Sequence, residues 1–236
     1  MDQWPHDISA EAFRRRWVLE GEALWRRVFD IHRDKMQIKN PHIAIGNLEK
    51  IFNSTFKLAN CKGFQAMSLR DLSRDTGISM GGLYAYIGSK DDLASAIEEV
   101  LRSTIDAVMS DQAVQDLPPV QRLRAIVFGD LYMNDIMHPW YYFCYLEAKG
   151  LSREQRDAAM QMELKFDERL QETFQAGVAQ GVFVAHNLAL LAANTTAMLQ
   201  QWYLKRWKFS RMGTRIEDYA QFVFDTTLDS LDSRAR

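Results

Sequence analysis

The sequence predicts an all-α fold, and three observations support this expectation. Apolar residues recur at steps of three and four over most of the chain, which is the spacing of one helix face. No run alternates between apolar and polar residues over a convincing strand length. Glycine, proline and capping residues divide the helical pattern into segments. With 236 residues, 47% of them hydrophobic and 25% charged, the chain is typical of a globular protein with a sizeable core.

The composition excludes several classes of protein. Five prolines and 12 glycines exclude collagen-like and low-complexity chains. The most apolar stretch, residues 188–199, is shorter than the about 18 apolar residues that a membrane-spanning helix needs. The first residues lack the basic and apolar regions of a signal peptide. Cys61 and Cys144 are too few for a disulfide framework, so we expect two free, buried thiols in a cytoplasmic protein without membrane association.

The first forty residues predict a helical extension. Between residues 9 and 37, apolar side chains such as Phe13, Trp17 and Leu24 share one face, which predicts one helix. Ser9 is its expected N-cap, because a serine hydroxyl accepts a hydrogen bond from the amides of the first turn.

Capping residues then mark a series of helices. Asn40 and Pro41 begin the first, because Asn caps a helix N-terminus and Pro fits its first position. Ser-Xaa-Xaa-Asp capping boxes at Ser68 and Ser89 each begin another, and Ser79 is the N-cap of a very short helix between these two. The expected helices cover residues 41–62, 69–76, 79–86 and 90–110, and the first three end at Gly63, Gly77 and Gly88.

The remainder of the chain predicts longer helices. Pro118 and Pro119 separate them from the preceding segment, and Pro139 precedes a shorter, aromatic helix. The expected ranges are 119–137, 140–149, 152–180, 186–207 and 214–231.

Residues 68–92 carry the most informative pattern. A helix, a glycine-containing turn and a short second helix form the helix-turn-helix plan, whose second helix lies in the major groove of DNA. Residues 42–90 carry six Lys and Arg against three Asp and Glu, whereas residues 91–236 carry 15 against 21. A basic segment on an acidic body suits a protein that binds nucleic acid.

The candidate DNA-contacting residues follow from this plan. Ile78 and Leu83 are expected to anchor the second helix, which leaves its small and polar residues for DNA. Glycines allow the helix backbone to approach the groove closely, tyrosine hydroxyls suit phosphate, and a lysine in a first helical turn is favourable when a phosphate lies beside it. The candidates are Ser68, Arg70, Ser79, Met80, Gly81, Gly82, Tyr84, Tyr86 and Lys90.

About fifty residues, from 43 to 93, resemble the N-terminal domain of the TetR family of bacterial repressors. The matching residues are Gly63-Phe64, Ser68-Leu69-Arg70-Asp71-Leu72, Thr76-Gly77-Ile78-Ser79, Gly82-Leu83-Tyr84-Ala85-Tyr86 and Ser89-Lys90-Asp91-Asp92-Leu93. The resemblance implies a homodimer that binds a palindromic double-stranded DNA operator and is released by a small molecule. It also implies dimerisation through the last two long helices, 186–207 and 214–231.

Three features depart from the family pattern. Ile87 stands where the family usually has Phe, Gly88 is unusual, and about forty residues precede the motif. The resemblance therefore predicts an extension (1–40), a DNA-binding domain (41–90) and an effector-binding and dimerisation domain (91–236). Arg14, Arg15 and Arg16 in the extension either contact DNA or, as we favour, form the solvated face of an amphipathic helix.

The effector expected from the apolar and aromatic character of the C-terminal helices is small and hydrophobic. An acyl thioester or lipid-like compound is the first candidate and a planar drug-like compound the second. The candidate contacts, each weighed against a plain core role, are Trp140, Tyr141, Phe143, Met162, Phe166, Met198 and Trp202.

The alternative function is an all-α enzyme or a structural interaction module that does not bind DNA. An enzyme needs a nucleophile with its base, or a ligand cluster, and the sequence contains neither HExxH nor GxSxG nor a glycine-rich phosphate loop. His138 and Glu147 are nine residues apart across a proline, which fits no usual metal-ligand spacing. We therefore expect no catalytic residue, no metal and no cofactor.

Overall fold

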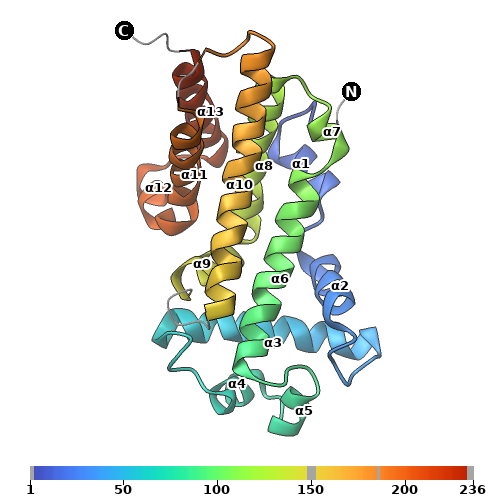
Figure 1. Ribbon diagram of the computed structural model, residues 1–236. Coiled ribbons are helices and arrows are strands. Elements are labelled where there is room, and N and C mark those ends of the chain that lie inside the picture. The colour runs from blue at the N-terminus through green and yellow to red at the C-terminus, as the bar shows by residue number, and fades with distance from the viewer. Residues whose placement is uncertain (1–2, 148–152, 185–186, 233–236) are drawn as a thin grey trace. The chain divides into compact units, whose positions relative to one another are not determined.

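A computed structural model describes residues 3–147, 153–184 and 187–232, which are all-α as predicted: these ranges contain helices, turns and bends but no strand (Figure 1). None of the described helices has the length and apolar character of a membrane span. In order, the helices are α1 (Ala10–Arg16), α2 (Gly21–His32), α3 (Pro41–Lys62), α4 (Leu69–Thr76), α5 (Met80–Tyr84), α6 (Lys90–Met109), α7 (Gln112–Gln115), α8 (Pro119–Ile136), α9 (His138–Leu146), α10 (Arg153–Ala179), α11 (Leu188–Leu204), α12 (Arg206–Met212) and α13 (Ile216–Asp232).

The chain folds into two compact units. Unit 1 comprises residues 1–17, 105–138 and 161–236, and unit 2 comprises residues 18–104 and 139–160. Helices α6 and α10 each begin in unit 2 and end in unit 1. This division follows contacts in space and differs from the three domains expected along the sequence, whose boundaries stay a prediction.

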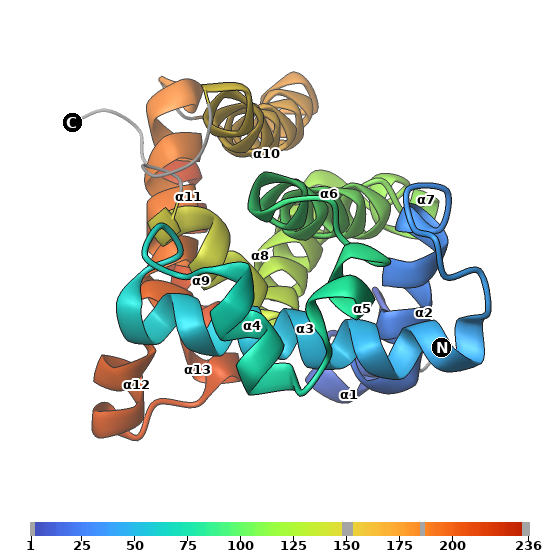
Figure 2. The same cartoon turned by 90° about the horizontal axis from the view of Figure 1, so that it is seen from below.

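Unit 2 is built on α3. The side chains of Leu48, Ile51 and Phe52 are buried, α2 and α4 pack against α3, and α5 packs against α4 (Figure 2). An aromatic cluster joins α2, α3 and α9, with the Phe52 ring 5.9 Å from that of Trp25 and 5.2 Å from that of Trp140. Aromatic pairs at these separations add to the stability that burial alone provides.

Unit 1 is built on α8, against which α1, α11 and α13 pack. Trp202 of α11 stacks on Phe209 and Tyr219, with ring centroids 5.2 and 5.5 Å apart. The Trp202 indole N–H donates to Asp135 Oδ1 at 3.1 Å, so this buried polar group is satisfied. Burial raises the pKa of Tyr219 to about 12, and its hydroxyl donates to the Met198 carbonyl.

The prediction of one helix over residues 9–37 is wrong. Ser9 caps α1 as expected, but the backbone is extended at Trp17 and Glu20, and Gly21 has a φ of +63°. Because glycine adopts positive φ without the penalty that a side chain brings, the chain changes direction there and α2 begins. The single periodic face does not reveal this break.

Smaller differences concern helix ends. Lys205 leaves helical geometry, so the helix expected over 186–207 ends at Leu204 and a separate α12 follows. The short α7 was not expected, and α5 ends two residues earlier than predicted, at Tyr84. Cys144 is buried as expected, but Cys61 is exposed because it lies on the solvent face of α3.

Candidate nucleic-acid interface

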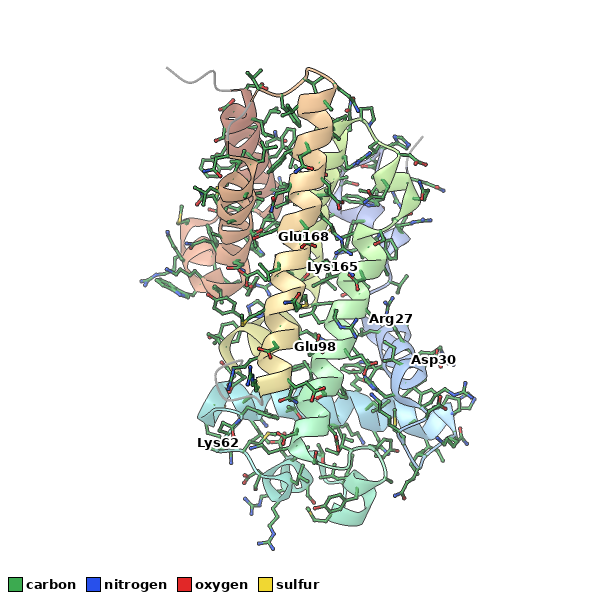
Figure 3. The ribbon with its side chains drawn as sticks, in the orientation of Figure 1. Arg27, Asp30, Lys62, Glu98, Lys165 and Glu168 are labelled. Carbon is green, nitrogen blue, oxygen red and sulfur yellow. The ribbon has the colours of Figure 1, made fainter. Side chains whose placement is uncertain are left out.

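The first helix of the predicted motif, α4, begins with the expected capping box. The Ser68 hydroxyl accepts from the Asp71 N–H at 3.2 Å, and Asp71 Oδ2 accepts the Ser68 N–H at 2.9 Å. Lys62, labelled in Figure 3, places its Nζ 2.6 Å from the same carboxylate. The hydrogen bond from Lys62, followed by those from Ser68, holds the pKa of Asp71 well below its usual value. The start of α4 is therefore fixed by charge-assisted hydrogen bonds.

The turn between α4 and α5 is held by a glycine and two side chains. Gly77 adopts the left-handed conformation, with φ of +71°, and ends α4. The Ile78 N–H donates to Thr76 Oγ1 at 3.2 Å, and the Ser73 hydroxyl donates to the Ile78 carbonyl at 2.6 Å. Both backbone groups of Ile78 are thus satisfied, which fixes the direction in which the next helix leaves the turn.

Helix α5 is capped and anchored as predicted. The Ser79 hydroxyl accepts from the Gly82 N–H at 3.1 Å, and Leu83 is fully buried. A Cβ added to Gly82 would lie only 2.9 Å from Ile78 Cγ2, whereas one added to Gly81 would meet nothing within 4 Å. Gly82 is therefore needed for packing within the motif, and only Gly81 offers an open backbone surface.

The remaining candidates on α4 and α5 differ in exposure. Arg70 and Ser68 are exposed, Met80 is half-buried, and Tyr84 is 48% exposed. Tyr86 is 7% exposed, and its hydroxyl accepts from Asn47 Nδ2 at 2.9 Å. The expectation that Tyr86 is presented to DNA is wrong, because the chain turns after Tyr84 and packs this ring inward.

Lys90 links the start of α6 to the loop that precedes α4. Its Nζ donates to the carbonyls of Gln65 and Met67, each at 2.9 Å, and lies 4.9 Å from the centroid of the Phe64 ring. Partial burial lowers the pKa of Lys90. The ammonium group thus has a structural role, which leaves one of its three donors for a further partner.

Two supporting residues were missed by the sequence analysis. Asn47 holds the Tyr86 hydroxyl, and Lys62 holds Asp71 from a different helix. Neither has a local sequence signal, because both act across at least nine positions of the chain.

The predicted effector contacts fall into different units. Trp140, Tyr141 and Phe143 belong to unit 2 and are buried, with the Phe143 ring 5.0 Å from Phe64. The others belong to unit 1, where two are buried and two half-buried: Phe166 and Trp202, then Met162 and Met198. The rings of Trp140, Phe143 and Trp202 pack against other buried aromatic rings, as core residues do, and their contact with an effector stays a prediction.

The remaining candidates have other partners. His138 Nε2 lies 3.0 Å from the Tyr203 carbonyl, while Glu147 accepts the Phe64 N–H at 3.1 Å. The described residues contain no group of three His, Cys, Asp or Glu that could hold a metal ion. Arg16 makes a bidentate ion pair with Asp111, with its Nε and Nη2 at 3.1 and 3.0 Å, inside unit 1.

Comparison with known proteins identifies the family. Residues 51–97 match the model of "Bacterial regulatory proteins, tetR family", and residues 116–231 match that of "Tetracyclin repressor-like, C-terminal domain". The transcriptional regulator HbdR from Aromatoleum sp. (strain CIB) is 22% identical over 175 residues, which cover 74% of this chain and 76% of HbdR.

Solved structures agree with this assignment. The TetR-family regulator PfmR from Thermus thermophilus is 27% identical, with a TM-score of 0.65 over 78% of this chain and 99% of PfmR. AibR, in complex with isovaleryl coenzyme A and operator DNA, shares the fold at 21% identity, with a TM-score of 0.61 over 79% of this chain and 98% of AibR. The chain belongs to the TetR family of bacterial transcriptional regulators, which are DNA-binding proteins and not enzymes.

Proposed function

We propose that this chain is a ligand-responsive repressor that reads a palindromic operator with α5. The observation that carries the proposal is the way α5 is presented. Leu83 and the Ile78 turn fix its inner side, while Gly81 and Tyr84 remain exposed on its outer side. A short, rigidly held helix with an open outer face matches the geometry of a recognition helix in the major groove.

Roles in DNA binding follow from the chemistry of each side chain. Gly81 allows the α5 backbone close to the base edges, and the Tyr84 hydroxyl is suited to donate to a phosphate oxygen. Arg70, exposed on α4, supplies a charge for the phosphate backbone. The proposed interface comprises Ser68, Arg70, Ser79, Met80, Gly81, Gly82, Tyr84 and Lys90, with Gly82 and Lys90 acting mainly by holding the motif in shape.

A palindromic operator requires two copies of α5, and we propose that α11 and α13 form the dimer interface. The two helices pack on each other, with a Thr195–Thr227 hydroxyl contact of 3.2 Å. Leu190 of α11 and Phe222 of α13 are each 61% exposed, so both helices offer a large apolar side chain that a second copy could cover. A twofold dimer would place the recognition helices about one DNA turn apart, ~34–36 Å.

The effector class that we propose is a small hydrophobic molecule, with an acyl thioester as first candidate. The complex of AibR with isovaleryl coenzyme A supports this class, since AibR has the same fold. Helix α6 runs without a break from unit 2 into unit 1. A shift of this helix on effector binding would therefore be transmitted to the unit that contains α5. The effector must bind the DNA-free state more tightly, typically by ~1–3 kcal/mol, or about 5–150-fold.

The test is to mix the purified protein with a labelled duplex taken from the DNA upstream of its own gene. Fluorescence anisotropy then measures how much of the duplex is bound. We expect nanomolar binding, a steep fall of affinity with salt, and two protein chains per duplex. Isovaleryl coenzyme A and longer acyl thioesters should release the DNA, whereas free coenzyme A serves as the matched control. A protein that stays monomeric, or that binds all duplexes equally, would contradict the proposal; binding without release would contradict only the effector class.

A further inference from the structure

The second half of the N-terminal extension belongs to the unit that contains the helix-turn-helix. Residues from 18 onward are part of unit 2, and α2 packs along α3. Leu24, Val28 and Phe29 are buried, and the Trp25 ring lies 5.9 Å from both Phe52 and Trp140. Helix α2 is therefore a component of the unit 2 core.

Polar contacts attach the same segment to α6. The Arg27 guanidinium, labelled on α2 in Figure 3, donates from Nη2 to the Ser103 carbonyl at 2.9 Å. Lys35 Nζ lies 3.1 Å from Glu99 Oε2. The extension is thus held at two points along α6 in addition to its apolar contact with α3.

The chain after α2 reaches the recognition helix itself. Met36 is only 3% exposed, and the following Gln37 donates its backbone N–H to the Ala85 carbonyl at 2.9 Å. Ala85 is the C-cap of α5. Because the last carbonyls of a helix have no partner within the helix, this hydrogen bond satisfies a group that α5 cannot satisfy alone.

This contact matters because α5 is so short. Five residues are far fewer than the about 12–15 that an isolated helix needs, so contacts from elsewhere in the fold must hold α5 in place. Its N-terminal end is held by the Ile78 turn and Ser79, as described above. At the C-terminal end the described contacts are the Gln37 hydrogen bond, the burial of Tyr86 and Ile87, and the Asn47–Tyr86 bond.

We propose that the extension positions the recognition helix, and that the Gln37 backbone N–H is the group through which it acts. This inference rests on the proposed role of α5 in reading DNA. With its C-terminal end held, α5 keeps one orientation, so that Gly81 and Tyr84 meet the groove without a prior ordering step. Loss of the bond should weaken recognition of the specific operator while leaving the attraction to phosphate unchanged.

The first experiment uses hydrogen exchange in the unaltered, DNA-free protein. The Gln37 amide lies in a loop, and its side chain is exposed, so without the bond it would exchange as an open loop amide. We expect it to be protected to the same degree as the amides of Leu83, Ala85 and Ile87, because all four open together. An unprotected Gln37 amide would overturn the proposal, whether or not the protein binds DNA.

The second experiment compares Gln37→Pro, which lacks the N–H, with the matched control Gln37→Ala, which keeps it. We expect Gln37→Pro to raise exchange at residues 83–87 and to weaken operator binding, each by about threefold to tenfold. Its affinity for non-operator duplex and its salt slope should equal those of Gln37→Ala. Equal exchange and equal operator affinity in the two variants would refute the positioning role. If Gln37→Pro does not fold, the exchange measurement on the unaltered protein decides.

Discussion

The paired glycines of α5 give the sharpest test of the interface, because the structure assigns them different roles. At Gly82 a new Cβ would lie 2.9 Å from Ile78 Cγ2 and 3.3 Å from Ser79 Oγ. The Ile78 methyl sits directly on a β-branched carbon, so it has little freedom to move aside. At Gly81 a new Cβ meets nothing, and the residue is exposed.

The expected energies follow from these distances. Both Gly→Ala changes gain up to about 1 kcal/mol of helix propensity, so the difference between the two variants isolates the steric cost at position 82. Overpacking of this kind typically costs about 1–3 kcal/mol. We therefore expect Gly82→Ala to be less stable than Gly81→Ala by that amount, which lowers its melting temperature by about 2–4 °C per kcal/mol.

DNA binding tests the exposed glycine, Gly81. Gly81→Ala places a methyl group on the surface proposed to approach the groove, so its operator affinity should fall about tenfold although its stability is equal to or above that of the unaltered protein. Urea or thermal unfolding gives the stability and fluorescence anisotropy gives the affinity. Equal melting temperatures would refute the packing role of Gly82, and an unchanged operator affinity for Gly81→Ala would refute its place at the groove.

Further predictions concern side chains around the motif and in the extension. Lys90→Met should lower the free energy of unfolding by about 0.5–1.5 kcal/mol, because two carbonyls lose their charged donor. No loss of stability would contradict the structural role of Lys90. If the dependence of log affinity on log salt concentration also falls by about 1 in slope, Lys90 contacts phosphate as well. Tyr84→Phe should lose operator affinity with an unchanged melting temperature; a large loss of stability would instead mark the ring as core. Burial lowers the pKa of His32, against the attraction of Glu99 and together with the repulsion of Lys35, so the unfolded chain binds a proton more readily. Stability should therefore fall as the pH drops through about 6.5, and less steeply in His32→Gln; parallel unfolding curves from about pH 7.5 to 5.5 would rule this out.

Local features of the motif were predictable from sequence because their partners are a few residues apart. The Ser68–Asp71 capping box, the Gly77 turn and the Ser79 N-cap each use groups within five residues of one another. Hydroxyl, carboxylate and glycine at fixed spacing are sufficient to specify such geometry.

Most features that the sequence did not reveal depend on distant partners. Tyr86 is turned inward by Asn47, 39 positions earlier, and nothing near Tyr86 in the sequence signals this. Lys90 was expected to hold a phosphate from the first turn of its helix, and that contact stays a prediction; its bonds to carbonyls 23 and 25 positions away were not foreseen. The break before Gly21 was hidden because apolar residues continue on the same periodic face across it.

The interrupted path of the chain through unit 2 has a consequence for how this regulator can be divided. A fragment of residues 41–90 would contain the whole helix-turn-helix yet lack Trp25, Trp140 and Phe143, which complete its aromatic core, and Glu147, which accepts the Phe64 amide. Unit 2 is discontinuous in the sequence, so no continuous fragment contains all of it without also containing residues 105–138 of unit 1. To transfer this helix-turn-helix to another effector-binding domain, helices α2 and α9 would therefore have to be transferred with it.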